Sequence, residues 1–152
     1  MEKNESQRMP RSMRNNNPLN IRRGEKWLGL SPEQTDSQFC RFLCAEWGWR
    51  AAFMLLTRTY YHKYKISTVR KIIQRWAPPV ENNTDAYVKR VVERTGLDPD
   101  VHLGIPSIYP HNWLMLACAM AEVESGRDNW DLMSMLRGWQ MARVDATLGK
   151  YT

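Results

Sequence analysis

Apolar residues recur every three or four positions over much of the chain that follows residue 45. The clearest run lies between residues 47 and 64, where five apolar side chains share one face: Trp49, Ala52, Phe53, Leu56 and Tyr60. This is the spacing of an α-helix that buries one stripe of side chains. We therefore expect a helix over residues 47–64.

Start and stop signals delimit two further helices in the middle of the chain. Ser67 or Thr68 can cap a helix over residues 69–76, and two prolines follow it. The next helix is expected to begin after Asn83 and Thr84 and to end at Gly96, a residue that readily takes the left-handed conformation of a helix stop. Residues 97–110 hold three prolines and a glycine and are predicted to form a loop.

Two more helices are predicted toward the C-terminus, over residues 112–125 and 131–146. Asn112 is a suitable N-cap for the first of them, and Gly126 follows its end. The last helix is expected to bury four side chains, which recur at helical spacing: Leu132, Met135, Leu136 and Trp139.

The front of the chain lacks this period. Residues 19–22 and 38–42 alternate apolar with polar positions, as half-buried strands do, and residues 1–13 show no periodicity and are predicted to be a disordered leader. The pattern predicts a mostly α protein, with a single domain over residues 14–152 and at most a small β-element near the N-terminus.

Charge adds a hint about partners. The net charge of the 152 residues is +6, and residues 41–80 carry eight Lys or Arg against the single acid Glu46. A basic middle indicates an anionic partner such as cell-wall polymer with its peptide carboxylates, unless the face is merely solvated. Nucleic acid is disfavoured, because the sequence shows no helix-turn-helix or RNA-binding signature.

The remaining composition points away from metals, cofactors and membranes. Cys40, Cys44 and Cys118 are spaced unlike the common zinc patterns, so we expect three free, buried thiols and neither a metal nor a cofactor. No apolar stretch reaches the roughly 18 residues that a membrane span needs, and the polar start is unlike a signal peptide. We expect synthesis in the cytoplasm, with any action at the cell wall or in a virion needing separate export.

One glutamate continues the apolar stripe of the helix over residues 112–125. Four residues share that stripe: Trp113, Leu116, Ala117 and Met120. Adding four to the last position gives Glu124, whereas Glu122 is turned away by about 200°. Partial burial at the negative end of a helix disfavours a carboxylate, so Glu124 is suited to act as a general acid if it borders a cleft. The alternative is that Glu124 pairs with a buried arginine.

The stretch Met120–Gly126, with Glu-Ser at the end of a helix, resembles the catalytic signature of lysozyme-like lytic transglycosylases. That resemblance implies a lysozyme-like domain in which Glu124 is the acid and base, with Ser125 beside it. Asn17–Gly24 (NPLNIRRG) is similar to the asparagine-rich segment that lines the cleft in lytic transglycosylases and bacterial glucosaminidases. It implies that Asn17 and Asn20 contact substrate, as does Trp27 in a Trp-Leu-Gly triplet similar to that of glucosaminidases.

A third stretch, Glu81–Val91, resembles the Thr-x-x-Tyr-Val-x-x-Val helix whose tyrosine reaches the catalytic centre in transglycosylases. It implies a substrate-binding role for Tyr87, and Glu81 at the start of the stretch is a further candidate for substrate binding. The chain also resembles a group of phage and prophage proteins, often labelled virion structural proteins, that share NNNP-x-NIR and RWAPP-x-EN-x-T-x-x-Y. In the enzymes the Glu-Ser pair precedes the other two stretches, so its place at the end of this chain implies a circular permutation.

The expected function is cleavage of peptidoglycan glycan strands, of the lytic transglycosylase or the muramidase and glucosaminidase type. A second carboxylate could come from Asp36, Glu46 or Glu81, of which Glu81 is the best choice. Without a second carboxylate, the anhydro-forming route is favoured. The alternative is a non-catalytic structural or wall-binding protein on the same scaffold, with phage virion components as partners.

Overall fold

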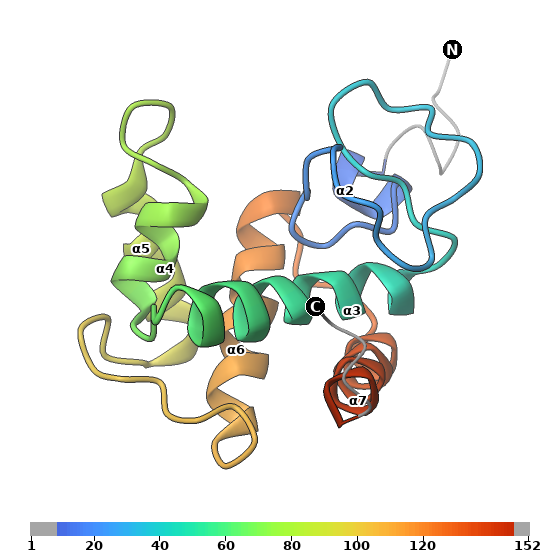
Figure 1. Ribbon diagram of the computed structural model, residues 1–152. Coiled ribbons are helices and arrows are strands. Elements are labelled where there is room, and N and C mark those ends of the chain that lie inside the picture. Colours follow the sequence, from blue (N-terminus) through green and yellow to red (C-terminus); the bar gives the residue numbers. More distant parts are fainter. Residues whose placement is uncertain (1–8, 148–152) are drawn as a thin grey trace. The chain divides into compact units, whose positions relative to one another are not determined.

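The computed structural model describes residues 9–147, and it confirms a mostly α protein (Figure 1). Its helices are α2 (Arg11–Arg14), α3 (Ala45–Met54), the π-helix η1 (Leu55–Lys63), α4 (Val69–Trp76), α5 (Thr84–Thr95), α6 (Pro110–Ser125) and α7 (Leu132–Thr147). Pairing between extended segments is confined, in this part of the chain, to two isolated antiparallel bridges: Arg22 with Phe39, and Leu30 with Phe42. This agrees with the expectation of at most a small β-element near the N-terminus.

The chain divides into two compact units. The first unit combines the residues up to Phe53 with those from Glu124 onward, and the second is Met54–Val123. The chain passes from one unit to the other after Phe53, within α3, and after Val123, within α6. No proline, glycine or polar linker therefore marks either boundary in the sequence.

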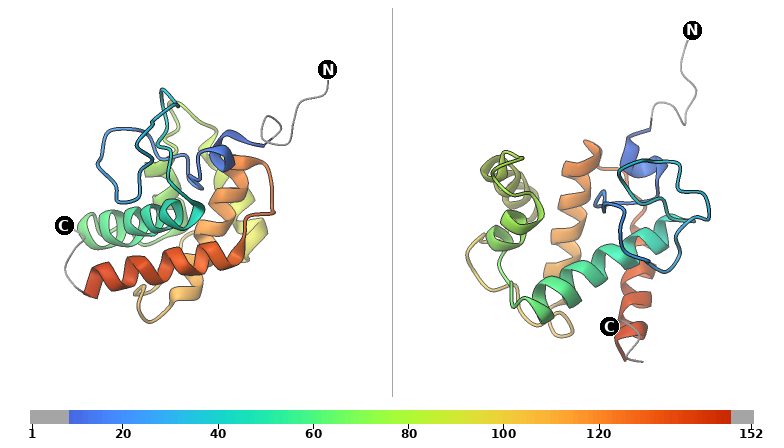
Figure 2. Two further views of the ribbon diagram at one scale, coloured as in Figure 1. Left: turned by 90° about the vertical axis from the view of Figure 1, so that its right-hand side faces the viewer. Right: turned by 45° about the horizontal axis from the view of Figure 1, so that its top comes forward.

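Two helices, α3 and α7, run side by side in the first unit (Figure 2). Gly138 permits their close approach, because a Cβ at this position would overlap the side chain of Trp49. Trp49 is completely buried, and its ring meets that of Trp130 at a centroid distance of 5.6 Å. Phe53 and Trp139 make a second edge-to-face contact at 5.1 Å. Aromatic rings thus supply much of the packing between these helices.

The buried face of α7 differs from the predicted one. Met135 is buried, but Leu132 and Leu136 are 58% and 39% exposed, so their predicted burial is wrong. The helix turns Gly138 and Ala142 inward with Met135 instead. Small residues allow two helices to come close yet contribute little to a hydrophobic pattern, which explains the misassigned face.

The predicted disordered leader is wrong for residues 9–13, while residues 1–8 lie outside the described part. Pro10 precedes the one-turn helix α2, in which Ser12 is only 1% exposed. Backbone bonds from Arg14 N to Pro10 O and from Asn15 N to Arg11 O close the turn. A single turn is too short to show a helical period, so its sequence looked structureless.

Helices α4 and α5 lie side by side in the second unit (Figure 1). The Thr68 side chain accepts a hydrogen bond from Lys71 N, so the predicted cap at Ser67 or Thr68 is confirmed at Thr68. The Asn83 side chain accepts a hydrogen bond from Ala86 N and caps α5, which begins at Thr84. Gly96 ends α5 at a φ of 73°, as expected for a left-handed stop.

Two helices differ from the expectation in their bounds. The helix predicted over residues 47–64 begins at Ala45 and continues after Met54 as the π-helix η1, a change that the apolar period does not encode. Helix α6 begins at Pro110 rather than Asn112, whose side chain donates to Leu103 O instead of capping. Proline suits a first helical turn because it has no N–H to satisfy.

The described residues contain no helix with the length and apolar character needed to cross a membrane. Within residues 9–147, no cluster of His, Cys, Asp or Glu is placed to hold a metal ion. The three cysteines are free, as predicted, although only Cys40 is buried, and Cys44 and Cys118 are partly exposed.

Candidate functional site

Glu124 lies at the end of α6 and is bound by an asparagine from the front of the chain. Asn20 Nδ2 donates a hydrogen bond of 3.1 Å to Glu124 Oε1, across 104 residues of sequence. Both side chains belong to the first unit, and both are partly exposed. The carboxyl group that continues the apolar stripe therefore has a neutral amide as a direct partner.

The loop that carries Asn20 is built around Asn17, which is completely buried. Asn17 Nδ2 donates to Ile21 O at 3.0 Å and to Cys40 O at 2.9 Å, while its Oδ1 accepts from Ile21 N at 2.9 Å. Asn20 follows in the left-handed conformation, with a φ of 51°. This geometry favours the turn-forming role of Asn17 over direct substrate contact, and it explains how Asn20 is presented.

A second asparagine attaches this loop to α3. Asn16 also has a φ of 51°, and its Nδ2 donates to Phe42 O at 3.0 Å. Its backbone carbonyl lies against Gly48 of α3, where any Cβ would overlap the carbonyl oxygen. Gly48 is therefore required for the loop to reach the helix.

Ser125 shapes the chain directly after Glu124. Its Oγ lies 3.0 Å from both the backbone N and the backbone O of Arg127, and it accepts a bond of 3.3 Å from Trp130 Nε1. Gly126 between them has a φ of 70°. These contacts hold the turn after α6, so Ser125 stabilises the backbone that carries the carboxyl group.

The neighbouring glutamate has a different environment. Glu122 Oε2 lies 3.4 Å from Arg94 Nε, and Cys118 Sγ is 3.9 Å from Glu122 Oε1. This ion pair belongs to the second unit and joins α5 to α6. Glu122 is a structural residue, which makes it a natural control for Glu124.

The structure also locates three other predicted substrate-binding residues: Tyr87, Glu81 and Trp27. Tyr87 is 8% exposed, and its hydroxyl donates to Met120 O at 3.4 Å, so its side chain packs in the core of the second unit. Glu81 is exposed in the loop before α5, in the second unit. Trp27 is half-buried in the first unit, and within the described residues its Nε1 has no hydrogen-bond partner.

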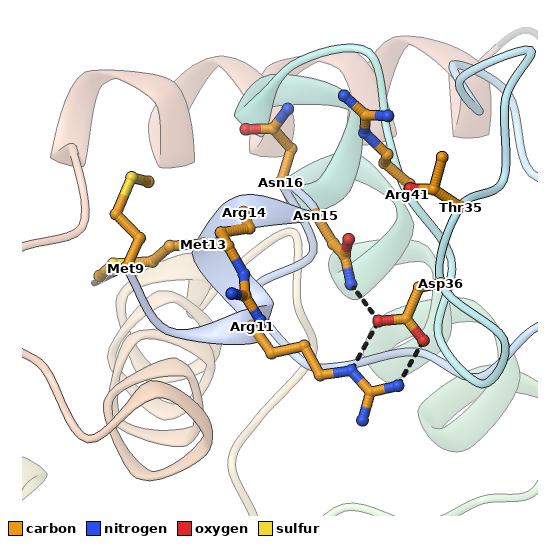
Figure 3. A pocket seen from close by; sticks show the side chains of 9 residues that line it. All are labelled: Met9, Arg11, Met13, Arg14, Asn15, Asn16, Thr35, Asp36 and Arg41. Atoms are coloured by element: carbon orange, nitrogen blue, oxygen red, sulfur yellow. Dashed lines mark hydrogen bonds and ion pairs between the residues drawn. The ribbon is translucent and has the colours of Figure 1, made fainter. Parts of the chain in front are cut away.

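An arginine–aspartate cluster lies beside α2 (Figure 3). Arg11 binds Asp36 with two bonds, Nε to Oδ2 at 2.6 Å and Nη2 to Oδ1 at 2.5 Å, and Asn15 Nδ2 donates to Oδ2 at 3.0 Å. The Arg11 guanidinium holds the pKa of Asp36 well below its usual range. Asp36 is thus a fixed anion, unsuited to donate a proton. The cluster was not predicted, because Arg11 had been assigned to the leader.

This cluster forms one wall of a pocket of about 550 Å³ in the first unit. Arg14 and Arg41 add two further cations to its lining, together with Asn16 and Thr35 (Figure 3). A signal for it was present in the sequence, since Arg11 and Arg14 directly precede three asparagines.

A second pocket, of about 530 Å³, lies between α3 and α7 and has a mainly apolar lining that includes Leu28, Trp47 and Val144. Glu46 lines this pocket, so it is not held by the Arg11 cluster. The three candidate second carboxylates therefore occupy three different settings: a fixed ion pair, an apolar groove and a loop of the second unit.

The Asp36 ion pair makes a prediction about acid stability. Because the pKa of Asp36 is lowered on folding, the ionised side chain adds to the free energy of unfolding at pH values above the ordinary aspartate pKa. This stabilisation is lost as the pH falls below that value. We expect Asp36→Asn to lower the melting temperature at pH 7, with a difference from wild type that shrinks below about pH 4. Thermal melts of both proteins between pH 7 and pH 2 measure this. A difference that stays constant with pH would contradict the assignment.

Protein P5 of Pseudoalteromonas phage PM2 is 34% identical to this chain over 134 residues, which cover 86% of this chain and 80% of P5. No known protein-family profile matches the chain.

Proposed function

The chain belongs to the family of protein P5 of Pseudoalteromonas phage PM2, and from this premise we propose that it cleaves the glycan strands of peptidoglycan, with Glu124 as general acid and base. Membership in this family places the chain among phage proteins. The name of P5 states no activity, so the proposed reaction depends on the residues around Glu124 and on the resemblance of the Glu-Ser and asparagine stretches to lytic transglycosylases.

The observation that carries the proposal is the hydrogen bond from Asn20 to Glu124. The Asn20 amide orients one oxygen of the Glu124 carboxyl group, and a fixed orientation is what a general acid and base requires. The bond also joins two of the three stretches that resemble the enzymes.

The anhydro-forming route needs only one carboxyl group. Glu124 donates its proton to the bridging glycosidic oxygen as the bond from that oxygen to the sugar C1 breaks. The resulting carboxylate then accepts the proton of a hydroxyl on the same sugar while that oxygen bonds to C1, which closes the anhydro ring and restores the acid. Asp36 is bound to Arg11 and is therefore unsuited to act as a second catalytic carboxylate, which supports the anhydro-forming route.

Insoluble sacculi labelled with a dye test the proposed function directly. Purified protein is incubated with them, and soluble dye is measured after the sacculi are removed by centrifugation. We expect soluble dye to accumulate in proportion to protein and time. Protein that sediments with the sacculi but releases no dye would instead support the non-catalytic, wall-binding alternative.

The positioning role of Asn20 can be tested without straining its backbone. Asn20→Gly removes the amide while glycine readily adopts the observed φ of 51°. We expect kcat to fall about 10- to 100-fold with little change in KM, because a misaligned acid slows the chemical step. Lys65→Gly is the control, since Lys65 has a φ of 59° in the second unit. An unchanged kcat for Asn20→Gly would refute the role.

A further inference from the structure

The pocket beside α2 lies apart from the hydrogen bond at Glu124 and has its own chemistry. We propose that it binds carboxylate groups on the peptide stems of peptidoglycan, through Arg14 and Arg41. The choice of polymer rests on the proposed function. The pocket volume of about 550 Å³ lies within the range of small-molecule sites and suffices for the end of a short peptide.

The charge available in the pocket comes from two arginines. Arg11 is fully engaged, because it binds Asp36 with two bonds and donates a third, from Nη1, to Gln38 Oε1 at 3.0 Å. The guanidinium groups of Arg14 and Arg41 have no hydrogen bond or ion pair within residues 9–147. Both line the pocket, and neither is buried (Figure 3). Arginine binds carboxylates in a bidentate manner, so each can accept one such group.

The other walls of the pocket suit the end of a peptide. Asp36 is held in its ion pair with Arg11, so a carboxylate ligand is directed to Arg14 and Arg41. Met9 and Met13 add apolar surface, which suits small aliphatic side chains of a peptide. A nucleic-acid backbone calls for a basic stripe along the surface rather than a concave pocket that contains an acid.

The test measures binding to peptidoglycan without turnover. All proteins carry Glu124→Gln, and their cosedimentation with purified sacculi gives an apparent Kd. We expect the Arg14→Gln, Arg41→Gln double variant to bind about 10- to 100-fold more weakly, because each lost hydrogen bond to a charged carboxylate lowers the binding affinity. Lys63→Gln with Lys71→Gln removes the same charge from exposed residues outside the pocket lining, and this control should bind as the parent does.

Altered sacculi identify the group that is bound. We expect the parent protein to lose affinity to a similar extent when the peptide carboxylates are converted to amides, or when an amidase strips the peptides from the glycan. Equal binding to intact and amidated sacculi would overturn the proposal. So would equal losses in the pocket variant and the control, or competition by DNA at lower concentration than by soluble stem peptide.

This experiment separates two failures. If wild-type protein releases no dye but binding depends on Arg14, Arg41 and peptide carboxylates, the pocket assignment stands and the glycan cleavage fails. If wild-type protein cleaves sacculi but binds intact and amidated sacculi equally well, the pocket assignment is wrong and the proposed glycan cleavage stands.

Discussion

Replacement of Glu124 by glutamine is expected to slow the release of soluble peptidoglycan by about 100- to 10,000-fold, the usual contribution of a general acid or base. Glutamine keeps the size of the side chain but cannot donate a proton to the glycosidic oxygen. The matched control is Glu122→Gln, two residues earlier on α6, where the carboxylate pairs with Arg94. We expect that variant to retain its rate, with at most a small loss of stability. Rates of dye release at equal protein concentration measure both.

The difference in rate between these two variants decides whether Glu124 is the catalytic acid. A similar fall in both would mean that any change at the end of α6 impairs the protein, and unchanged turnover in Glu124→Gln would exclude it as the acid. Melting temperatures of both variants within a few degrees of wild type would show that the comparison reports on chemistry.

The largest expected effect on stability is at Gly48. In Gly48→Ala the new Cβ would overlap the backbone oxygen of Asn16, and neither α3 nor the asparagine loop can move without disturbing buried neighbours. We expect the free energy of unfolding to fall by roughly 2–4 kcal/mol, at or above the upper range for overpacked sites. Urea denaturation followed by circular dichroism measures this. Because the same loop presents Asn20, the folded fraction should also lose activity.

Gly96→Ala separates steric overlap from backbone strain. A Cβ at Gly96 would meet nothing within 4 Å, but the φ of 73° is unfavourable for alanine. We expect a loss of about 1 kcal/mol from this conformational term. If Gly48→Ala were no more destabilising than Gly96→Ala, the packing of the asparagine loop on α3 would be wrong.

Local signals predicted the second unit well. The caps at Thr68 and Asn83 and the stop at Gly96 each depend on residues within four positions, so a short stretch of sequence contains all the information. The face of α7 could not be predicted in the same way. Its orientation follows from Gly138, whose lack of a side chain matters only because Trp49 packs against it.

The candidate site was predictable only in part. Helical spacing indicates that Glu124 continues the apolar stripe of α6. Asn20, which donates a hydrogen bond to it, is 104 residues away in the sequence, and only the resemblance of the asparagine stretch indicates that Asn20 belongs to the same site. The resemblance implies that Asn17 contacts substrate like Asn20, but the Asn17 amide is bonded to the backbone of Ile21 and Cys40. The pairing of Arg11 with Asp36 joins a one-turn helix to an irregular segment 25 residues later, and no periodicity relates them.

The most direct test of Glu124 as sole acid and base is mass spectrometry of the fragments released from purified sacculi. We predict that wild-type protein releases fragments that end in an anhydro sugar, and that Glu124→Gln releases almost none. Fragments with ordinary reducing ends would point to a second carboxylate and a hydrolytic route. The same anhydro fragments from Glu124→Gln in equal yield, or no fragments from the wild type, would contradict the account.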